Sequence, residues 1–363
     1  MAIADALRNL ASKGWRRLAS RARWALKVLW EGVKDGFHAV RLKGKRACDA
    51  AINLSKDLFR RARRPVRRAQ RRWHQTAEEW RVHRTEWAIE RQLEAIVARN
   101  RLLVVGPWFS EVGFETLYWI PFLSWVKTAF RLDPARVVAV SRGGVAAWYR
   151  DIAARYIEIW DDLSPDEFAR RNAARGLVKQ HHYSALDDEI LDSVTRRLGT
   201  RDFDVIHPSL MYRLFTLYWS GQRPMGFIDR HTRFTRQTPD SLIDPALLPR
   251  EYVAVKLYAA RSLPDTAEIR ARLAELVSRL AERSPVVLLD TGLVLEDDHA
   301  DYRFASAGVV SARRWMTPQN NLGVQTQIAA GASRFVGTCG GLTWLVPRLG
   351  VDTSALYVDP SWL

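Results

Sequence analysis

The chain has 363 residues and a mass of 41.6 kDa, a length that fits about two or three domains. Its 47% apolar and 10% aromatic residues exclude a chain that is disordered throughout, and its 20 glycines and 15 prolines exclude a low-complexity or collagen-like one. The two cysteines, Cys48 and Cys339, exclude a disulfide scaffold and a four-cysteine zinc site, and they are typical of a reducing compartment.

The formal net charge of +16 comes almost entirely from the N-terminal part of the chain. Residues 1–100 contain 25 Lys and Arg against 10 Asp and Glu, whereas residues 101–363 contain 31 against 30. A pI of about 10.3 therefore describes a basic appendage, so the overall charge does not indicate that the whole chain binds nucleic acid.

Residues 1–100 are rich in Arg, Ala, Leu and Trp and poor in β-branched residues, which predicts a basic amphipathic helical region. We expect no membrane span here, because no window of about 18 residues is free of charge. We also expect no secretory signal, because no apolar stretch with a small-residue cleavage site follows Met1. From about Thr76 to Ala98 a second helix carries Trp80, Trp87, Ile89, Leu93 and Ile96, and it is expected to dock on the body of the protein that begins at residue 101.

A polybasic stretch interrupts this region, and Pro65 within it is expected to break or kink the helix. Anionic lipid attracts such segments by about 1 kcal/mol per basic residue, and tryptophans suit the membrane interface. The predicted membrane contacts are Arg60, Arg61, Arg63, Arg64, Arg67, Arg68, Arg71, Arg72, Trp15, Trp24 and Trp30. Two alternatives stay open: a solvated arm that packs on the body or on another subunit, and nucleic-acid binding. The second is the weaker, because no nucleic-acid fold signature accompanies the charge.

From Arg101 the sequence alternates short apolar runs with helical patterns, which predicts parallel, doubly wound sheets. The predicted strands are 102–105, 137–140, 156–160, 203–206, 252–257, 285–289, 309–310, 334–337 and 355–358. Helices are predicted over 115–130, 266–283, 323–330 and 342–349. A stretch rich in Arg, Thr and Pro between Gly221 and Glu251 indicates a domain junction. The fold class is therefore α/β, with two Rossmann-like domains over residues 101–235 and 236–363 after the basic region 1–100.

Two such domains place the carboxyl ends of their strands on opposite sides of a cleft, where ligands bind. Directly after the first strand, Gly113 permits close approach of a ligand, and Glu111 and Glu115 place two carboxylates near a helix start. Either carboxylate can act as a general base for a hydroxyl nucleophile, and Glu111 is slightly preferred. The alternative is that Glu115 only favours the positive end of the helix and Glu111 is solvated.

Two further clusters follow strands of the second domain. Lys256 and Arg261 can neutralise a diphosphate group, although an ordinary surface pair is the alternative. The turn Gly337–Thr343 lies between a strand and a helix, where backbone N–H groups bind phosphate, although a plain tight turn would have the same composition.

Weaker signals complete the set. Ser141 and Arg142 can hold an acceptor, or they form only a turn between a strand and a helix. A solvated loop is predicted around His181 and His182. Their spacing from Asp187, Asp188 and Glu189 is not that of a known metal motif. No GxGxxG fingerprint or GxxxxGK[ST] loop is present, which removes the main support for a dehydrogenase or a P-loop NTPase.

Residues 101–363 resemble the two-Rossmann-domain glycosyltransferases of the GT-B fold. The stretch Ile328–Val351 is similar in rhythm to the donor-binding end of heptosyltransferase-like and fucosyltransferase-like enzymes. The resemblance implies that four residues of the glycine turn approach the donor, and that Lys256 and Arg261 offset its diphosphate. The four are Thr338, Gly340, Gly341 and Thr343. The acidic residue of the heptosyltransferase-like turn is absent, since Thr338-Cys339 stands there.

The resemblance implies a metal-independent glycosyltransferase without a cofactor, which uses a nucleotide sugar as co-substrate. We expect it to act on a hydroxyl of an envelope glycan or a lipid-linked acceptor, with Glu111 or Glu115 as base and Gly113, Ser141 and Arg142 on the acceptor side. The basic region places the protein in the cytoplasm, peripherally on the inner face of the cytoplasmic membrane. A non-catalytic protein that binds sugar nucleotides or assists assembly, and a nucleic-acid-associated protein, are the alternatives.

Overall fold

The computed structural model describes residues 27, 31, 45–175, 179–293 and 300–360. The chain divides into two compact units, Met1–Arg81 and Val82–Leu363. Within the described ranges, no helix is both long enough and apolar enough to cross a membrane.

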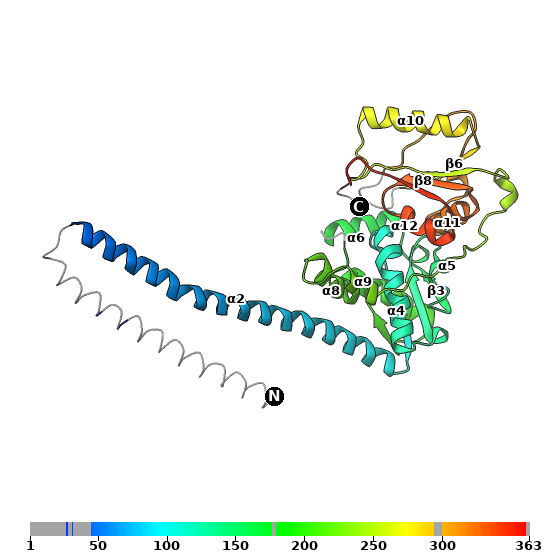
Figure 1. Cartoon of the computed structure of the whole chain (residues 1–363). Helices are drawn as coiled ribbons and strands as arrows, with labels where there is room; N and C mark the ends of the chain where they lie inside the picture. The colour runs from blue at the N-terminus through cyan, green and yellow to red at the C-terminus, as the bar shows by residue number, and fades with distance from the viewer. Residues whose placement is uncertain (1–26, 28–30, 32–44, 176–178, 294–299, 361–363) are drawn as a thin grey trace. The chain divides into compact units, whose positions relative to one another are not determined.

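One 54-residue helix, α2, runs from Lys45 to Ala98 and continues through Pro65 (Figure 1). The predicted break at Pro65 and the separate helix from Thr76 are therefore wrong. The sequence on both sides of Pro65 is rich in Ala, Arg and Gln, whose helix propensity opposes the roughly 3 kcal/mol that an interior proline costs. Trp15, Trp24 and Trp30 lie outside the described residues, and so do the side chains of the eight arginines between Arg60 and Arg72.

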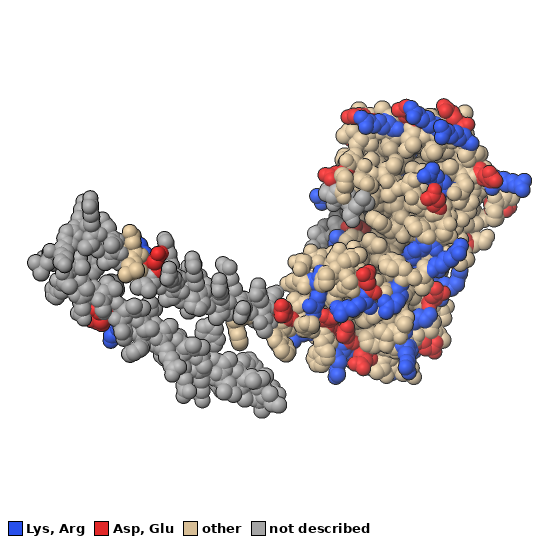
Figure 2. Space-filling model, in the orientation of Figure 1, with Lys and Arg blue, Asp and Glu red and all other residues tan. Residues whose placement is uncertain are grey.

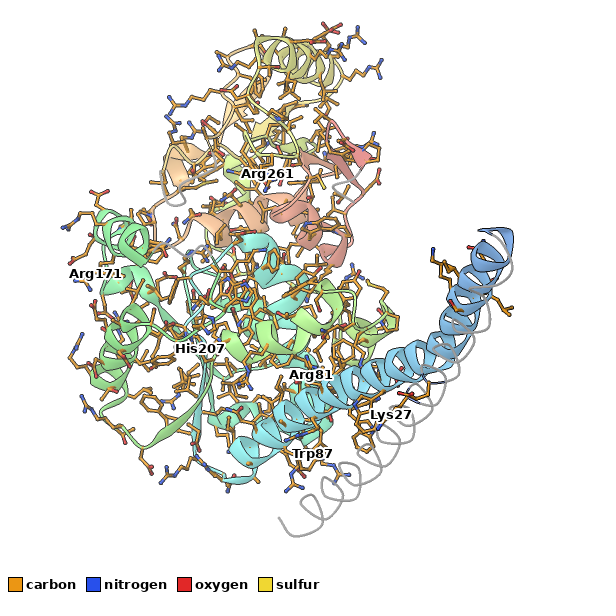
Figure 3. The ribbon with its side chains drawn as sticks, turned by 90° about the vertical axis from the view of Figure 1, so that its left-hand side faces the viewer. Lys27, Arg81, Trp87, Arg171, His207 and Arg261 are labelled. Carbon is orange, nitrogen blue, oxygen red and sulfur yellow. The ribbon has the colours of Figure 1, made fainter. Side chains whose placement is uncertain are left out.

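The last turns of α2 belong to the second unit and pack into its core. Val82, Ile89, Leu93 and Val97 recur on one face of the helix and are buried in the same apolar cluster as Leu103. This confirms the predicted docking through Ile89 and Leu93, which Val82 and Val97 join, but not through the predicted Trp80 and Trp87. Trp80 and Trp87 are 68% and 61% exposed, and Trp87 is labelled in Figure 3.

The first sheet has four parallel strands in the order β3-β2-β1-β4. Val104 of β1 pairs with Val138 of β2 on one side and with Val205 of β4 on the other. The strands are β1 (Leu102–Val105), β2 (Val137–Ser141), β3 (Arg155–Glu158) and β4 (Phe203–Ile206). Between and after them lie α3 (Val112–Phe114), η1 (Glu115–Trp119), α4 (Ile120–Phe130), η2 (Pro134–Arg136), α5 (Ala146–Tyr149), η3 (Ile159–Asp161), α6 (Pro165–Arg175), α7 (Ala185–Leu198), α8 (Pro208–Trp219) and α9 (Gly226–Arg230).

The second sheet has five parallel strands in the order β7-β6-β5-β8-β9, so it repeats the pattern of the first and adds one strand. The strands are β5 (Val253–Lys256), β6 (Val286–Leu288), β7 (Val309–Ser311), β8 (Arg334–Thr338) and β9 (Thr353–Leu356). The helical elements are η4 (Pro245–Leu247), α10 (Ala267–Ala281), η5 (Arg313–Trp315), α11 (Asn321–Gly331) and α12 (Leu342–Leu349). The last strand thus begins two residues earlier than predicted, and β3 ends at Glu158 because Ile159–Asp161 form the helical turn η3.

Side chains alternate in direction along each strand, so both faces of each sheet are packed against other elements. Leu103 and Val105 point into a large apolar cluster that also contains Ala254 and Phe335 of the second sheet, so the two lobes share one core. Val104 packs on the opposite face of the first sheet against α6 and α7. Residues of the second sheet such as Val255 pack with α10. Figure 1 shows α10 on one face of the second sheet and α11 and α12 on the other. The predicted α/β class with two Rossmann-like lobes is confirmed.

The two sheets are joined by the segment between α9 and β5, which contains the predicted domain boundary after residue 235. That boundary and the one at residue 100 stay predictions. Figure 2 shows Lys and Arg interspersed with Asp and Glu on the visible face of the second unit, as expected from the balanced charge of residues 101–363.

Candidate active site

The strand order of each sheet indicates at which point of its edge a ligand would bind. In both sheets the order reverses beside the first strand, between β1 and β4 and between β5 and β8. Ligands of open α/β sheets bind outside the carboxyl ends of the strands at this point. The loops that matter are therefore those that follow Val105, Ile206, Lys256 and Thr338.

The loop after β1 reaches the glycine turn after β8. A Cβ atom on Gly113 would lie 3.1 Å from the backbone nitrogen of Gly341 and 3.7 Å from Cδ1 of Trp344. Gly341 itself has a φ of 47°, a left-handed conformation that favours glycine. The carboxyl ends of the two sheets therefore meet here, and Gly113 permits the close approach.

The loop after β2 makes a second contact between the lobes. The carbonyl oxygen of Gly143 accepts hydrogen bonds from the backbone nitrogens of Leu322 and Gly323, both at 2.9 Å. Nearby, Nε1 of Trp148 donates to Oγ1 of Thr326 at 3.1 Å. The Ser141–Gly144 loop is thus packed against α11, which leaves less room for an acceptor than the sequence predicts.

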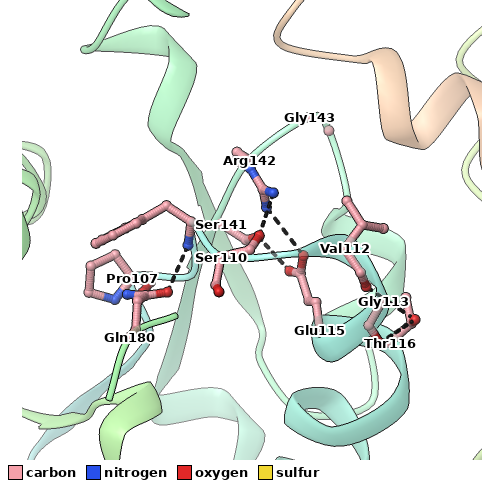
Figure 4. Close-up of polar contacts among 12 residues, drawn as sticks. Pro107, Ser110, Val112, Gly113, Glu115, Thr116, Ser141, Arg142, Gly143 and Gln180 are labelled. Carbon is pink, nitrogen blue, oxygen red and sulfur yellow. Dashed lines mark hydrogen bonds and ion pairs between the residues drawn. The ribbon is translucent and has the colours of Figure 1, made fainter. Parts of the chain in front are cut away.

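Glu115 is fully buried at the centre of a polar cluster (Figure 4). Its Oε1 accepts hydrogen bonds from Ser141 Oγ and from the Tyr149 hydroxyl, both at 2.6 Å. Arg142 Nη1 lies 3.6 Å from its Oε2, and Arg142 also donates to the carbonyl of Ser110. Burial, followed by the negative charge of Glu115, raises the pKa of Tyr149 well above its usual range, so that hydroxyl stays a donor.

This cluster changes the roles predicted for three residues. Glu115, Ser141 and Arg142 are brought together as expected, but they turn inward and are 0%, 0% and 3% exposed. Such burial does not favour Glu115 as a group that takes a proton from a substrate, nor Ser141 and Arg142 as acceptor contacts. Glu111 is half-buried at the start of α3 and stays the predicted carboxylate base of this loop.

In the second lobe, the charge of Lys256 is balanced. Its Nζ lies 2.7 Å from Asp301 Oδ1 and donates to the carbonyl of Leu289 at 2.9 Å. The other oxygen of Asp301 accepts from the backbone nitrogen of Thr291 at 2.7 Å. Lys256 therefore joins the end of β5 to the loop after β6, and it brings less net charge to a diphosphate than predicted. Arg261, labelled in Figure 3, lies on an exposed loop further along the chain.

Two threonines hold the glycine turn in shape. Oγ1 of Thr338 donates to the carbonyl of Tyr258 and accepts from its backbone nitrogen, both at 3.0 Å. Oγ1 of Thr343 accepts from the backbone nitrogen of Gly340 at 2.9 Å. The predicted donor contacts Thr338 and Thr343 are thus already engaged within the turn. In the described part of the chain, the backbone nitrogens of Gly341 and Leu342 have no hydrogen-bond acceptor, so they are the turn's available donors.

The sequence predicts a solvated loop around His181 and His182, but the structure anchors this segment beside the site. Gln180 is fully buried, and its side chain donates to the carbonyl of Pro107 at 2.8 Å and accepts from the backbone nitrogen of Phe109 at 3.1 Å. Lys179–Tyr183 is therefore fastened across the loop that follows β1.

Asp187, also assigned to that loop, is fully buried beside His207. His207 directly follows β4, and its Nε2 lies 2.8 Å from Asp187 Oδ1. Its Nδ1 accepts from the backbone nitrogen of Ser209, so Nε2 is assigned as the donor to Asp187. Burial opposes ionisation of Asp187, but the hydrogen bonds from His207 and Ser184 outweigh it and lower the pKa. Two signals were available in the sequence: a histidine between a strand and Pro208, and the Ser184-x-x-Asp187 capping pattern.

Two cavities are formed elsewhere. One of 510 Å³ is lined by the inter-lobe segment, including Arg236, Arg250 and Tyr252. The other, of 310 Å³, lies in the first lobe beside Glu158 and Arg171. Neither includes Lys256, Arg261 or Gly340.

One group of side chains has the composition of a metal site. Ligand atoms of Glu86, Glu90 and His231 all lie within 4.8 Å of one another. However, Glu86 pairs with Arg223 at 2.8 Å and with Arg230 at 3.4 Å. The group is therefore an ion-pair network that fastens α2 to α9, and two guanidinium groups already offset the carboxylate that a cation would need.

These features define a two-lobed α/β protein with paired Rossmann-like sheets whose carboxyl ends face each other. No protein-family model matches the chain, and no curated protein matches it.

Among solved structures, the chain is similar to a glycosyl transferase of family 9 from Veillonella parvula, with a TM-score of 0.38, 12% identity, and 72% of this chain and 82% of that chain covered. It is also similar to E. coli heptosyltransferase WaaC with ADP, with a TM-score of 0.33, 16% identity, and 71% and 88% covered. A third similar structure is WaaC with ADP-2-deoxy-2-fluoro heptose, with a TM-score of 0.34, 17% identity, and 71% and 90% covered.

Proposed function

We propose that this protein is a glycosyltransferase that moves a sugar from a nucleotide diphosphate donor to a hydroxyl group of an envelope glycan or lipid-linked acceptor. The observation that carries the proposal is the contact between Gly113 and Gly341, which joins the ligand-binding edges of two Rossmann-like sheets. A nucleotide held at one edge can then present its sugar to a group held at the other.

The second lobe supplies the donor side in this proposal. The backbone N–H groups of Gly341 and Leu342, at the start of α12, can bind a phosphate of the donor. Arg261 contributes charge from the exposed loop that follows β5, whereas Lys256 acts mainly through its pair with Asp301. In the transfer, the acceptor oxygen bonds to the anomeric carbon as the bond from that carbon to the diphosphate breaks, and a basic group takes the hydroxyl proton.

The basic region supports a location on the inner face of the cytoplasmic membrane. The eight arginines between Arg60 and Arg72 follow one another on α2, and anionic lipid attracts such clusters. Full-length protein should float with phosphatidylcholine vesicles only when anionic phosphatidylglycerol is included. Replacing the eight arginines by Gln should abolish flotation, whereas replacing Arg270, Arg272 and Arg279 of α10 should not. Flotation that ignores lipid charge would remove the membrane from the proposal, and charge-dependent binding to DNA in its place would favour the nucleic-acid alternative.

Donor binding is tested by thermal unfolding of the full chain with a panel of nucleoside diphosphates and nucleotide sugars. A ligand at 100 times its Kd adds about 2.7 kcal/mol of stability. Gly113→Ala places a methyl group against Gly341 and should weaken that response. Gly226→Ala is the matched control, because nothing lies within 4 Å of its added Cβ. If no nucleotide raises the unfolding temperature of the wild-type chain, the proposal is wrong.

A non-catalytic sugar-nucleotide-binding protein is the second candidate. It is favoured by the complete burial of Glu115 and by the neutralisation of Lys256. The two candidates differ in turnover: both predict a thermal shift with a nucleotide sugar, but only the enzyme releases nucleoside diphosphate from it.

A further inference from the structure

The segment Lys179–Tyr183 covers the point where the strand order of the first sheet reverses. Two of the three hydrogen bonds of the Gln180 side chain go to the loop after β1, and in the third its Nε2 donates to Asp187 Oδ1 at 3.3 Å. These contacts hold the segment against the loop after β1. His181 and Lys179, on either side of Gln180, stay partly exposed.

Three side chains form a row at this edge: His181, Tyr212 and Ser110. His181 is at the partly exposed end of this row. Its ring packs on Tyr212 of α8, with ring centroids 4.6 Å apart and planes inclined by 49°. The hydroxyl of Tyr212 lies 3.3 Å from Oγ of Ser110, in the loop after β1. Tyr212 and Ser110 are buried. His181 is therefore the member of the row that a molecule arriving at the edge can reach.

We propose that His181 takes the proton from the acceptor hydroxyl during sugar transfer, an inference that rests on the proposed function. The acceptor O–H bond breaks and its proton passes to an imidazole nitrogen of His181. The acceptor oxygen bonds to the anomeric carbon, and the electron pair of the broken C–O bond leaves on the diphosphate. The imidazolium then returns its proton to water, which restores the neutral base.

The surroundings of His181 suit this task. Burial, followed by the positive charges of Lys179 and His182, lowers its pKa, so the ring is neutral and able to accept a proton at neutral pH. Lys179 is held nearby, with Nζ 3.9 Å from the centroid of the Phe114 ring. Tyr212 is the titratable group that faces the ring from α8.

Histidine is also a better match to the reaction than the carboxylates of the loop. A general base works best when its pKa is near the operating pH, and the unperturbed pKa of histidine, about 6.5, is nearer to neutral than that of a carboxylate, about 4. Glu115 is buried with its Oε1 engaged by two hydroxyls, which leaves Glu111 as the competing base.

The test compares His181→Gln with His83→Gln, an exposed histidine of α2, in the full-length protein. Release of nucleoside diphosphate is measured with the nucleotide sugar that gives the largest thermal shift, using detergent-extracted envelope lipids as acceptor. We expect His181→Gln to lower kcat by about 10²- to 10⁴-fold with an unchanged donor-induced thermal shift, and His83→Gln to keep wild-type kcat. The wild-type rate should fall along an acid limb at lower pH than the ordinary histidine pKa of about 6.5, because the pKa of His181 is lowered, and His181→Gln should lack that limb.

The outcomes separate the two proposals. If His181→Gln keeps wild-type kcat and its acid limb while Glu111→Gln loses activity, Glu111 is the base and the inference about His181 is wrong. If the wild-type chain releases no nucleoside diphosphate from any nucleotide sugar, the proposed function itself fails, and His181 loses its reaction with it.

Discussion

The two sheets share the order of their first four strands, but the loops that follow β1 and β8 at their ligand-binding edges differ in charge. At the first edge a carboxylate and a guanidinium are buried together, Glu115 with Arg142, and hydroxyl groups complete the cluster. At the second edge, backbone amides and the hydroxyls of Thr338 and Thr343 shape an uncharged turn. A loop built around buried charge is therefore fixed before any ligand binds, whereas a turn of backbone amides is suited to binding an anion.

The largest effect should come from breaking the buried cluster of the first edge. Glu115→Ala leaves Arg142 buried without its carboxylate and should lower the free energy of unfolding by about 3–5 kcal/mol, measured by urea unfolding. Loss of less than about 1 kcal/mol would contradict the assignment of Glu115 as the centre of the cluster.

Asp187→Asn should have a smaller effect that depends on pH. We expect a loss of about 2 kcal/mol at pH 7, because His207 and Ser184 lose an ionised acceptor. The pKa of Asp187 is lower in the folded chain than its usual value of 3.8. Its ionisation therefore adds stability above pH 3.8, and this contribution disappears as the pH falls through the folded pKa.

Urea unfolding at several pH values checks this prediction. The difference between wild type and Asp187→Asn should be full at pH 7 and should close in acid, whereas the exposed neighbour variant Asp188→Asn should match wild type throughout. A difference that grows in acid would contradict the sign.

A substitution at the ligand-binding edge of the second sheet should lower the free energy of unfolding by less. Thr343→Val keeps the shape of the side chain but removes the acceptor of the Gly340 N–H, which should lower the free energy of unfolding by about 1 kcal/mol. Thr195→Val is the control, since the Thr195 hydroxyl makes no hydrogen bond within the described part of the chain. An effect as large as that of Glu115→Ala would remove the contrast between the edges.

The smallest change in the free energy of unfolding should come from a charged pair that lies at neither ligand-binding edge. Glu268 pairs with Arg272 at 2.6 Å on the exposed face of α10. Glu268→Ala should change the free energy of unfolding by less than about 0.5 kcal/mol, measured in the same urea titration. A loss above about 1 kcal/mol would mean that exposed pairs contribute here as much as buried ones.

Elements that depend on local sequence were predicted well. Apolar runs such as Leu102–Val105 specify buried parallel strands because both of their faces are covered. The glycine turn before Leu342 was recognised because a strand, two glycines and a helical pattern follow one another directly. Each of these elements is determined by a few residues that are neighbours in the sequence.

Features that depend on distant partners were not predicted. Asp187 looks like part of an acidic surface loop until His207 is brought beside it by β4. Glu115 turns inward because Ser141 and Tyr149, from β2 and α5, offer it donors. The pairing of Lys256 with Asp301 likewise joins segments 45 residues apart. Composition near Glu115 and Lys256 carries no sign of these partners, whereas the Ser184-x-x-Asp187 capping pattern and the histidine before Pro208 are signals for Asp187 and His207.

The apolar core that the two lobes share has a kinetic consequence. Rotating the lobes apart as rigid bodies would break the bonds from Leu322 and Gly323 to Gly143 and would wet the side chains packed between α11, α12 and the first sheet. Ligand entry should therefore proceed by local opening of the surface loops, with amide protons of α11 exchanging as slowly as those of the central strands when a ligand binds.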